Sequence, residues 1–251
     1  MSGAASDTAS HREFLNGYYG WARHIYDLTR KYYLFGRDTA ISQLLADQSW
    51  KRLVEIGPGT GRNLRKLHEA RPSATLGGIE ASDEMLEHAQ AKCPWAKIQH
   101  GFAENAEYTD LVGDRPDRIL FSYCLSMVQD EQAALDNAVR TLAPGGKVII
   151  VDFADLSDMR TPMRQGLRKW LDSFHVQPLD TTIIDTFNPR ITYGPGRYFL
   201  IAEIDALVDD GSADDAVSDV DAVSDVDAMS DVDAMSDVDA VSDVDDVSDV
   251  N

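Results

Sequence analysis

Short runs of almost wholly apolar residues alternate along most of the chain with segments whose apolar positions recur every three or four residues. The runs predict buried strands, and the longer period predicts amphipathic helices. Strands are expected at residues 53–56, 75–80, 97–100, 118–122, 147–152 and 197–202. Helices are expected at residues 63–70, 83–91 and 130–142, and Ser82 is expected to cap the second.

Strands that alternate with helices and are apolar throughout are typical of a parallel sheet that is buried on both faces. Right-handed crossovers then predict an α/β fold, with a Rossmann-like, doubly wound and mostly parallel sheet. Ligands of such sheets bind at the carboxyl ends of the strands. The site is therefore sought in the residues that follow each apolar run.

Before the first predicted strand, one apolar stripe continues at helical spacing through residues 14–35. Its members are Phe14, Tyr18, Trp21, Ile25, Leu28, Tyr32 and Phe35. Tyr19, Tyr26 and Tyr33 lie seven residues apart beside this stripe. We expect an N-terminal helix that closes over the ligand site as a lid.

The acidity of the chain is concentrated at its C-terminal end. Residues 209–251 contain 16 aspartates and no lysine or arginine, so the rest of the chain carries only about −4 of the net charge of −20. Residues 216–251 are six hexads of the type AVSDVD. Like charges and small apolar residues favour disorder over a calcium-binding array, because the hexads lack the glycine and glutamate of an EF-hand loop. We expect disorder at 1–10, one domain at 11–208 and an acidic tail at 209–251.

Several features narrow the class of protein. Cys93 and Cys124 are too few for a disulfide framework and lack metal-ligand spacing. The N-terminus has no apolar signal region, and no apolar run is long enough to span a bilayer. We expect a cytoplasmic protein without a metal or a nucleic-acid partner. Peripheral contact with the inner face of the membrane stays open.

The segment VEIGPGTGRN (54–63) places glycines two residues apart behind a strand that contains an acid. A P-loop would need a lysine that is absent here. A dinucleotide site would need a small residue where Arg62 stands. Glu55 would also repel a pyrophosphate, whereas a cationic ligand removes that conflict. S-adenosylmethionine carries a sulfonium and an ammonium but no phosphate, so it is the preferred ligand. The alternative is that the glycines form a tight turn that binds no ligand.

Other strand ends complete the predicted cofactor site. Glu80 ends the second strand, where a carboxylate accepts hydrogen bonds from ribose hydroxyls. Residues 102–104 follow the third strand and are expected beside the adenine, with Met85 packed on the ring. The full set of expected cofactor-binding residues is Glu55, Gly57, Gly59, Gly61, Asn63, Glu80, Met85, Ala103, Glu104 and Ser122.

On EIGPGTG (55–61), Glu80 and PGGKVIIVDF (144–153), the sequence resembles the class I S-adenosylmethionine-dependent methyltransferases. IYDLTRKYYLFGRD (25–38), FSYCLSM (121–127) and RKWLDSFHVQP (168–178) are similar to one subfamily, the methyltransferase of bacterial betaine-lipid synthesis. The resemblance implies three N-methylations of diacylglyceryl-homoserine. It covers residues 14 to about 205 and does not extend to the tail.

Methyl transfer to an amine needs an aromatic surface for the cationic product and a route for protons. Tyr26 and Tyr123 are the candidates for the first role and His175 for the second, although each also fits a purely structural role. The acceptor is expected to be a lipid with an amino-acid headgroup. Phosphatidylethanolamine or a small soluble amine remains an alternative, as does a cofactor-binding or scaffold protein without turnover.

A basic amphipathic helix is expected around residues 160–174. Arg160, Arg164 and Arg168 recur every four residues, which places them along one face. The apolar side comprises Met163, Leu167, Trp170, Leu171 and Phe174. Such a helix is either a solvated face over a buried stripe or a surface that rests on an anionic membrane.

Overall fold

The computed structural model describes residues 34–172 and 177–207. The chain divides into Met1–Asp209 and Asp210–Asn251, and every described element belongs to the first unit. The expected lid helix lies outside the described residues except for its last two positions. The hexads lie outside them entirely.

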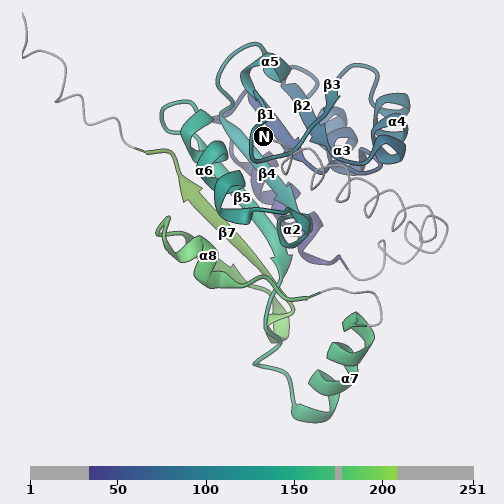
Figure 1. Cartoon of the computed structure of the whole chain (residues 1–251), viewed down its shortest axis with the longest axis vertical. Coiled ribbons are helices and arrows are strands. Elements are labelled where there is room, and N and C mark those ends of the chain that lie inside the picture. Colours follow the sequence, from purple (N-terminus) through teal and green to yellow (C-terminus); the bar gives the residue numbers. More distant parts are fainter. Residues whose placement is uncertain (1–33, 173–176, 208–251) are drawn as a thin grey trace, which may run out of the picture. The chain divides into compact units, whose positions relative to one another are not determined.

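The described residues form the elements labelled in Figure 1. The strands are β1 Arg52–Ile56, β2 Thr75–Glu80, β3 Lys97–His100, β4 Arg118–Ser122, β5 Lys147–Phe153, β6 Arg190–Tyr193 and β7 Phe199–Asp205. The helices are α2 Gly36–Ala46, α3 Arg62–Ala70, α4 Asp83–Lys92, α5 Thr109–Val112, α6 Glu131–Thr141, α7 Thr161–Asp172 and α8 Thr181–Asp185. Short 3₁₀ turns lie at η1 Leu125–Met127 and η2 Pro195–Arg197.

Within the described part of the chain, the strands form a seven-stranded sheet in the order β3-β2-β1-β4-β5-β7-β6. The first five strands pair in parallel, and β7 joins β5 in the antiparallel direction. This is the expected Rossmann-like, mostly parallel α/β fold. The strand order reverses between β1 and β4, so a crevice for a ligand opens at their carboxyl ends.

Hydrophobic residues on the two faces of the sheet form two separate cores. Along β4, Ile119 and Phe121 belong to one core while Leu120 belongs to the other, as the alternation of side chains in a strand requires. Helices α5, α6 and α8 contribute to the first core, and α2, α3 and α4 to the second. Both faces are thus covered, which explains why the strands are apolar throughout.

Helix starts are set by side-chain caps at two of the expected places. The hydroxyl of Ser82 accepts a hydrogen bond from the amide of Met85 at 3.4 Å and begins α4. The carboxylate of Asp130 accepts one from Ala133 at 2.9 Å and begins α6. Each cap satisfies an amide that would otherwise have no partner in the first turn.

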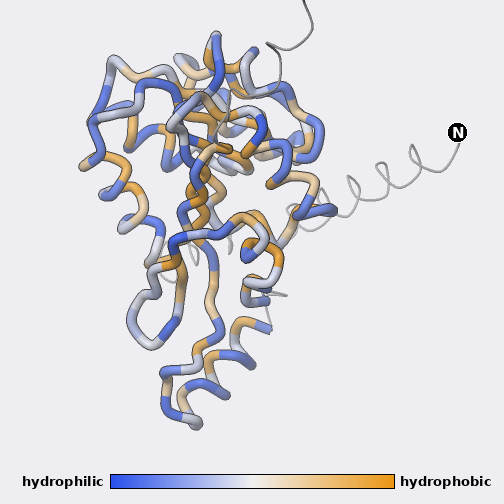
Figure 2. Tube along the Cα trace, turned by 90° about the vertical axis from the view of Figure 1, so that its left-hand side faces the viewer, coloured by the Kyte–Doolittle hydropathy of each residue, from blue (hydrophilic) through white to orange (hydrophobic). Residues whose placement is uncertain are grey.

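Helix α7 lies apart from the other helices (Figure 1) and mixes hydrophobic with hydrophilic positions (Figure 2). Leu171 is its buried residue, while Met163 is 60% and Trp170 38% exposed. The expected basic amphipathic helix is therefore present over residues 161–172, and Phe174 lies outside the described residues. Across 34–172 and 177–207, no helix combines the length and apolar character that crossing a membrane requires.

Replacing Gly61 with alanine is expected to lower the free energy of unfolding by about 2–3 kcal/mol. Gly61 has a φ of +72°, and a Cβ there would lie 2.7 Å from the sulfur of Cys93. Gly166 in α7 is the matched control, because a Cβ there meets nothing within 4 Å. Gly166→Ala should stabilise the protein by about 0.5–1 kcal/mol, and equal urea midpoints for both variants would contradict the prediction.

Candidate functional site

The glycine-rich turn after β1 lies directly against the end of β2. Gly57, Gly59 and Gly61 all have φ between 57° and 72°, a region that strains side chains other than glycine. The amide of Gly57 donates to the carbonyl of Ile79 at 2.8 Å. A Cβ on Gly57 would lie 3.0 Å from that of Cys124. The turn is therefore compact, and the N-terminus of α3 begins directly behind it.

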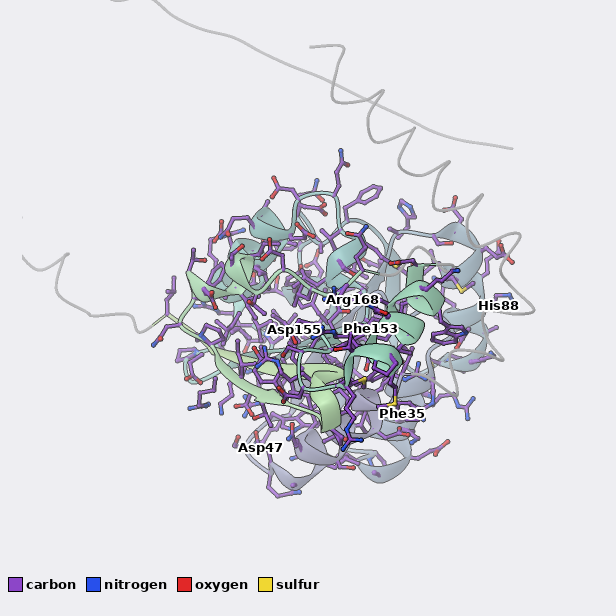
Figure 3. The ribbon with its side chains drawn as sticks, turned by 90° about the horizontal axis from the view of Figure 1, so that it is seen from below. Phe35, Asp47, His88, Phe153, Asp155 and Arg168 are labelled. Carbon is purple, nitrogen blue, oxygen red and sulfur yellow. The ribbon has the colours of Figure 1, made fainter. Side chains whose placement is uncertain are left out.

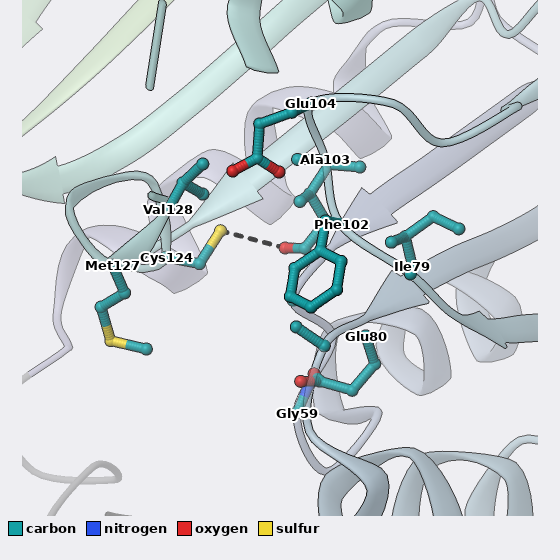
Figure 4. Close-up of a pocket in the computed structure, with 13 residues that line it drawn as sticks. Gly59, Ile79, Glu80, Phe102, Ala103, Glu104, Cys124, Met127 and Val128 are labelled. Atoms are coloured by element: carbon teal, nitrogen blue, oxygen red, sulfur yellow. Dashed lines mark hydrogen bonds between the residues drawn. The ribbon is translucent and has the colours of Figure 1, made fainter. Parts of the chain in front are cut away.

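Glu80 ties this turn to the end of β2. One carboxylate oxygen accepts from the amide of Gly59 at 2.9 Å, and the other accepts from the amide of Ser82 at 3.0 Å. The residue is 5% exposed. Its carboxylate is thereby held in a fixed orientation at the edge of a cleft (Figure 4). Hydrogen bonds from ribose hydroxyls are the expected use of an acid at this position.

The cleft beside Glu80 encloses about 600 Å³ when the space open to solvent is counted. Gly57, Gly59 and Glu80 form one part of its wall, and the expected adenine neighbours Ala103 and Glu104 form another. Phe102, Ile79 and Val128 add apolar surface (Figure 4). A carboxylate next to apolar side chains suits a nucleoside. Its ribose would bind Glu80, and its base would lie between the apolar residues.

Other expected cofactor residues lie behind the surface of the cleft. Met85 is 2% exposed, and it does not line the cleft, so its contact with adenine remains a prediction. Gly61 and Asn63 lie at the start of α3, behind the lining glycines. Sequence reasoning missed Cys124, Met127 and Val128, which line the opposite wall from the turn after β4.

Glu55 is buried at the end of β1 and is 1% exposed. The amide group of Asn63 donates to its Oε1 at 2.6 Å, while Oε2 has no hydrogen-bond partner among the described residues. Burial raises the pKa of Glu55 to about 7, although Asn63 and the positive charge of Arg37 oppose the shift. A buried acid with an unused oxygen fits the cationic part of S-adenosylmethionine.

The raised pKa of Glu55 predicts a loss of stability as the pH rises. Its pKa is about 7 in the folded protein against an ordinary 4.5, so the folded state holds the proton more tightly. Stability should therefore fall between these two values, by up to about 3 kcal/mol. Thermal melts from about pH 5 to 7.5 should show this slope in the wild type and a smaller slope in Glu55→Gln. Parallel curves would contradict the prediction.

Three buried carboxylates converge at the carboxyl ends of β1, β2 and β5. Burial raises the pKa of the Cys124 thiol well above its usual range, and the negative charges of Asp152, Glu55 and Glu80 raise it further. Asp152 is 1% exposed and accepts from the amide of Phe153 at 2.8 Å. Asp152, Glu80 and, once ionised, Glu55 therefore place negative charge at this edge of the sheet.

Tyr123 lies at the same edge with a φ of 54°, in the left-handed region. Its hydroxyl accepts from the amide of Gly36 at 3.3 Å, and its ring packs 4.7 Å from that of Phe153. Burial, and then the charge of Asp152, raise its pKa well above the usual range. The hydroxyl keeps its proton at neutral pH, so the ring and the hydroxyl act as a surface and a hydrogen-bonding group rather than as a base.

Ser122, also expected at the cofactor, is 7% exposed next to Tyr123, and its hydroxyl has no hydrogen-bond partner among the described residues. Tyr26 and His175, the other two candidates for catalysis, lie outside the described residues. Their roles, and that of Tyr123, remain predictions.

Comparison with known proteins agrees with this geometry. The family model described as a methyltransferase domain matches residues 26–190. A demethylmenaquinone methyltransferase of Tropheryma whipplei is 30% identical over 139 residues, covering 48% of this chain and 54% of that protein. The chain thus spans about half the length of that relative.

Two solved structures share the fold. The plantazolicin methyltransferase BpumL, solved with S-adenosyl-homocysteine, has a TM-score of 0.58 at 15% identity over 80% of this chain and 97% of its own. The N-methyltransferase NodS of Bradyrhizobium japonicum, also in complex with that compound, has a TM-score of 0.50 at 18% identity. The match covers 68% of this chain and 85% of NodS. The chain therefore belongs to the methyltransferase-domain family, and S-adenosylmethionine is its cofactor.

Proposed function

We propose that the chain methylates the amino group of diacylglyceryl-homoserine three times and so forms a betaine-lipid headgroup. The segments that resemble the betaine-lipid enzyme support this, because residues 121–127 include Cys124 and Met127, which line the cleft, and the buried Tyr123 next to them. In a second such segment, residues 25–38, the amide of Gly36 donates a hydrogen bond to the Tyr123 hydroxyl. The resemblance is thus concentrated where an acceptor would meet the cofactor.

The observation that carries the proposal is the buried acidic edge formed by Glu55, Glu80 and Asp152. An acceptor that arrives as an ammonium and leaves as a permanent cation is favoured by such an edge. The buried rings of Tyr123 and Phe153 pack on each other beside this edge and keep water away from it. An uncharged acceptor would gain nothing from these charges.

Bound S-adenosylmethionine supplies a methyl group that is already activated, so the chain mainly positions the amine and excludes water. In each round the ammonium first gives one proton to solvent water, which leaves the nitrogen neutral. The nitrogen lone pair then forms the N–C bond, the C–S bond breaks, and its electron pair stays on sulfur. Asp152 and Tyr123 hold the nitrogen at the carboxyl edge, which accounts for repeated methylation of the same atom.

A lipid acceptor also requires contact with a membrane, and α7 is the surface proposed for it. Arg168 and Lys169 are exposed on this helix, and Arg160 is exposed just before it, while Met163 adds exposed apolar surface. Cationic and apolar side chains together favour an anionic membrane surface. We propose that the protein acts at the inner face of the membrane.

A second candidate is C-methylation of a quinone, which the name of the Tropheryma whipplei relative favours. Phosphatidylethanolamine and a small soluble amine are further acceptors that fit the same acidic edge. The quinone would be methylated on carbon and the amines on nitrogen, and a direct assay with purified acceptors separates all of them.

The test supplies purified protein and S-adenosylmethionine labelled in the methyl group with four acceptors. They are diacylglyceryl-homoserine, phosphatidylethanolamine, a demethylated menaquinone and free homoserine. We expect the label chiefly in diacylglyceryl-homoserine, as mono-, di- and trimethylated products. Label mainly in the quinone would overturn N-methylation, and comparable label in free homoserine would overturn the lipid acceptor.

A further inference from the structure

A second hollow lies between α7 and the turn before β7, outside the cofactor cleft. It encloses about 910 Å³ including space open to solvent. Its walls are apolar and include Phe35, Met159, Leu167, Trp170, Tyr198 and Phe199. We call this hollow the α7 groove. Phe35 is 62% and Trp170 38% exposed, which is unusual for such large apolar side chains.

Packed side chains join the α7 groove to the edge where the acceptor is expected. Gly36 donates its amide to the Tyr123 hydroxyl, and the preceding residue, Phe35, lines the groove. A series of ring contacts follows the same path. Tyr123 lies 4.7 Å from Phe153, Phe153 lies 5.7 Å from Tyr198, and Tyr198 lies 5.6 Å from Phe35. Tyr123, Phe153 and Tyr198 are buried, so their rings form the wall between the groove and the edge where the acceptor is expected.

The rim of the groove carries positive charge. Arg168 donates to the backbone oxygen of Asp155 at 3.1 Å and is exposed beside Lys169 (Figure 3). An apolar groove with cationic side chains beside it is suited to a chain that comes from an anionic bilayer. A polar peptide or a soluble metabolite would find few partners on the groove walls.

We propose that the α7 groove holds an acyl chain of the acceptor glycerolipid while its amino headgroup reaches Tyr123. This inference rests on the proposed function, because it assigns the second part of the same substrate. Each methylene removed from water contributes about 0.8 kcal/mol. Occupation of the groove would therefore select long-chain lipid over the bare headgroup.

The experiment compares two acceptors with the full-length protein. One is long-chain diacylglyceryl-homoserine in detergent micelles, and the other is glyceryl-homoserine without acyl chains. Trp170→Ser and Leu167→Ser remove apolar groove surface from a helix that is mostly exposed, so both variants should fold. Gln165→Ser is the control, because Gln165 is exposed on the same helix but does not line the groove.

We expect the groove variants to raise KM for the long-chain lipid about tenfold. For glyceryl-homoserine, kcat/KM should stay within about twofold of the wild type, and Gln165→Ser should behave like the wild type with both acceptors. Equal loss on both acceptors with a lower melting temperature would overturn the proposal, since Leu167 and Trp170 would then only stabilise the fold. An unchanged KM for the long-chain lipid would also overturn it.

Binding of a fluorescent fatty acid separates this proposal from the proposed function. If the wild type methylates neither acceptor yet binds the probe, and Trp170→Ser does not, the groove is an acyl site and the proposed acceptor is wrong. If no variant changes probe binding, the acyl site is wrong whatever the methylation assay gives.

Discussion

Glu80→Ala is expected to weaken S-adenosylmethionine binding by about a hundredfold or more. A carboxylate that accepts two hydrogen bonds from ribose hydroxyls contributes about 1.5–3 kcal/mol for each bond. The substitution also removes the oxygens that hold the amides of Gly59 and Ser82. Titration calorimetry with S-adenosylmethionine measures the effect directly.

Glu87→Ala is the control for this substitution, because Glu87 is an exposed acid of α4 and its loss changes the net charge equally. Its affinity should equal that of the wild type. Circular dichroism at the calorimetry temperature shows that Glu80→Ala is folded. A folded Glu80→Ala protein with wild-type affinity would mean that the ribose does not lie at Glu80.

Raising the pH from about 6 to 7.5 should increase the affinity for S-adenosylmethionine roughly five- to tenfold. Over this range Glu55, with a pKa of about 7, passes from mostly neutral to mostly ionised. Its negative charge attracts the cationic part of the ligand, and burial keeps that attraction from being screened. Glu55→Gln should bind more weakly at the higher pH and should show little dependence on pH.

Ligands of different charge show which group Glu55 faces. Methylthioadenosine carries neither the sulfonium nor the amino-acid part, so its affinity should not depend on the ionisation of Glu55. S-adenosyl-homocysteine keeps the ammonium but lacks the sulfonium. If all three ligands have the same pH dependence, Glu55 does not interact with the charge of the cofactor.

Most strands could be predicted within two residues because their apolar runs end at turn-forming residues. β5, for example, follows Pro144-Gly145-Gly146 and was expected at 147–152. The last strand begins at Phe199 rather than at residue 197, because Gly196 and Arg197 adopt positive φ in the preceding turn. The pattern of apolar residues does not indicate that an arginine adopts a positive φ, so it could not predict this turn.

The short helices α5 and α8 were missed, and so were β6 and α2, for which the physical reasons are clear. β6 is a four-residue edge strand with no buried residue, so it lacks an apolar run. α2 begins at Gly36, a residue that usually interrupts helices. Here the missing side chain makes room for Phe199, whose ring lies 2.5 Å from an added Cβ.

The cofactor side of the site was easier to predict than the acceptor side. Gly57, Gly59 and Glu80 belong to a motif whose chemistry requires those residue types, and all three line the cleft. Met127 and Val128 line it as generic apolar residues of a turn, so no residue type marks them. The acidic edge also depends on Asp152, whose meaning appears only when β4 and β5 are placed side by side.

Lipid analysis of cells tests the central claim most directly. The chain is produced in a host that makes diacylglyceryl-homoserine, and the extracted lipids are examined by mass spectrometry. The account predicts a trimethylated homoserine lipid with the wild-type chain and none with Glu80→Ala. Unmethylated diacylglyceryl-homoserine accumulating beside a well-produced wild-type chain would contradict it.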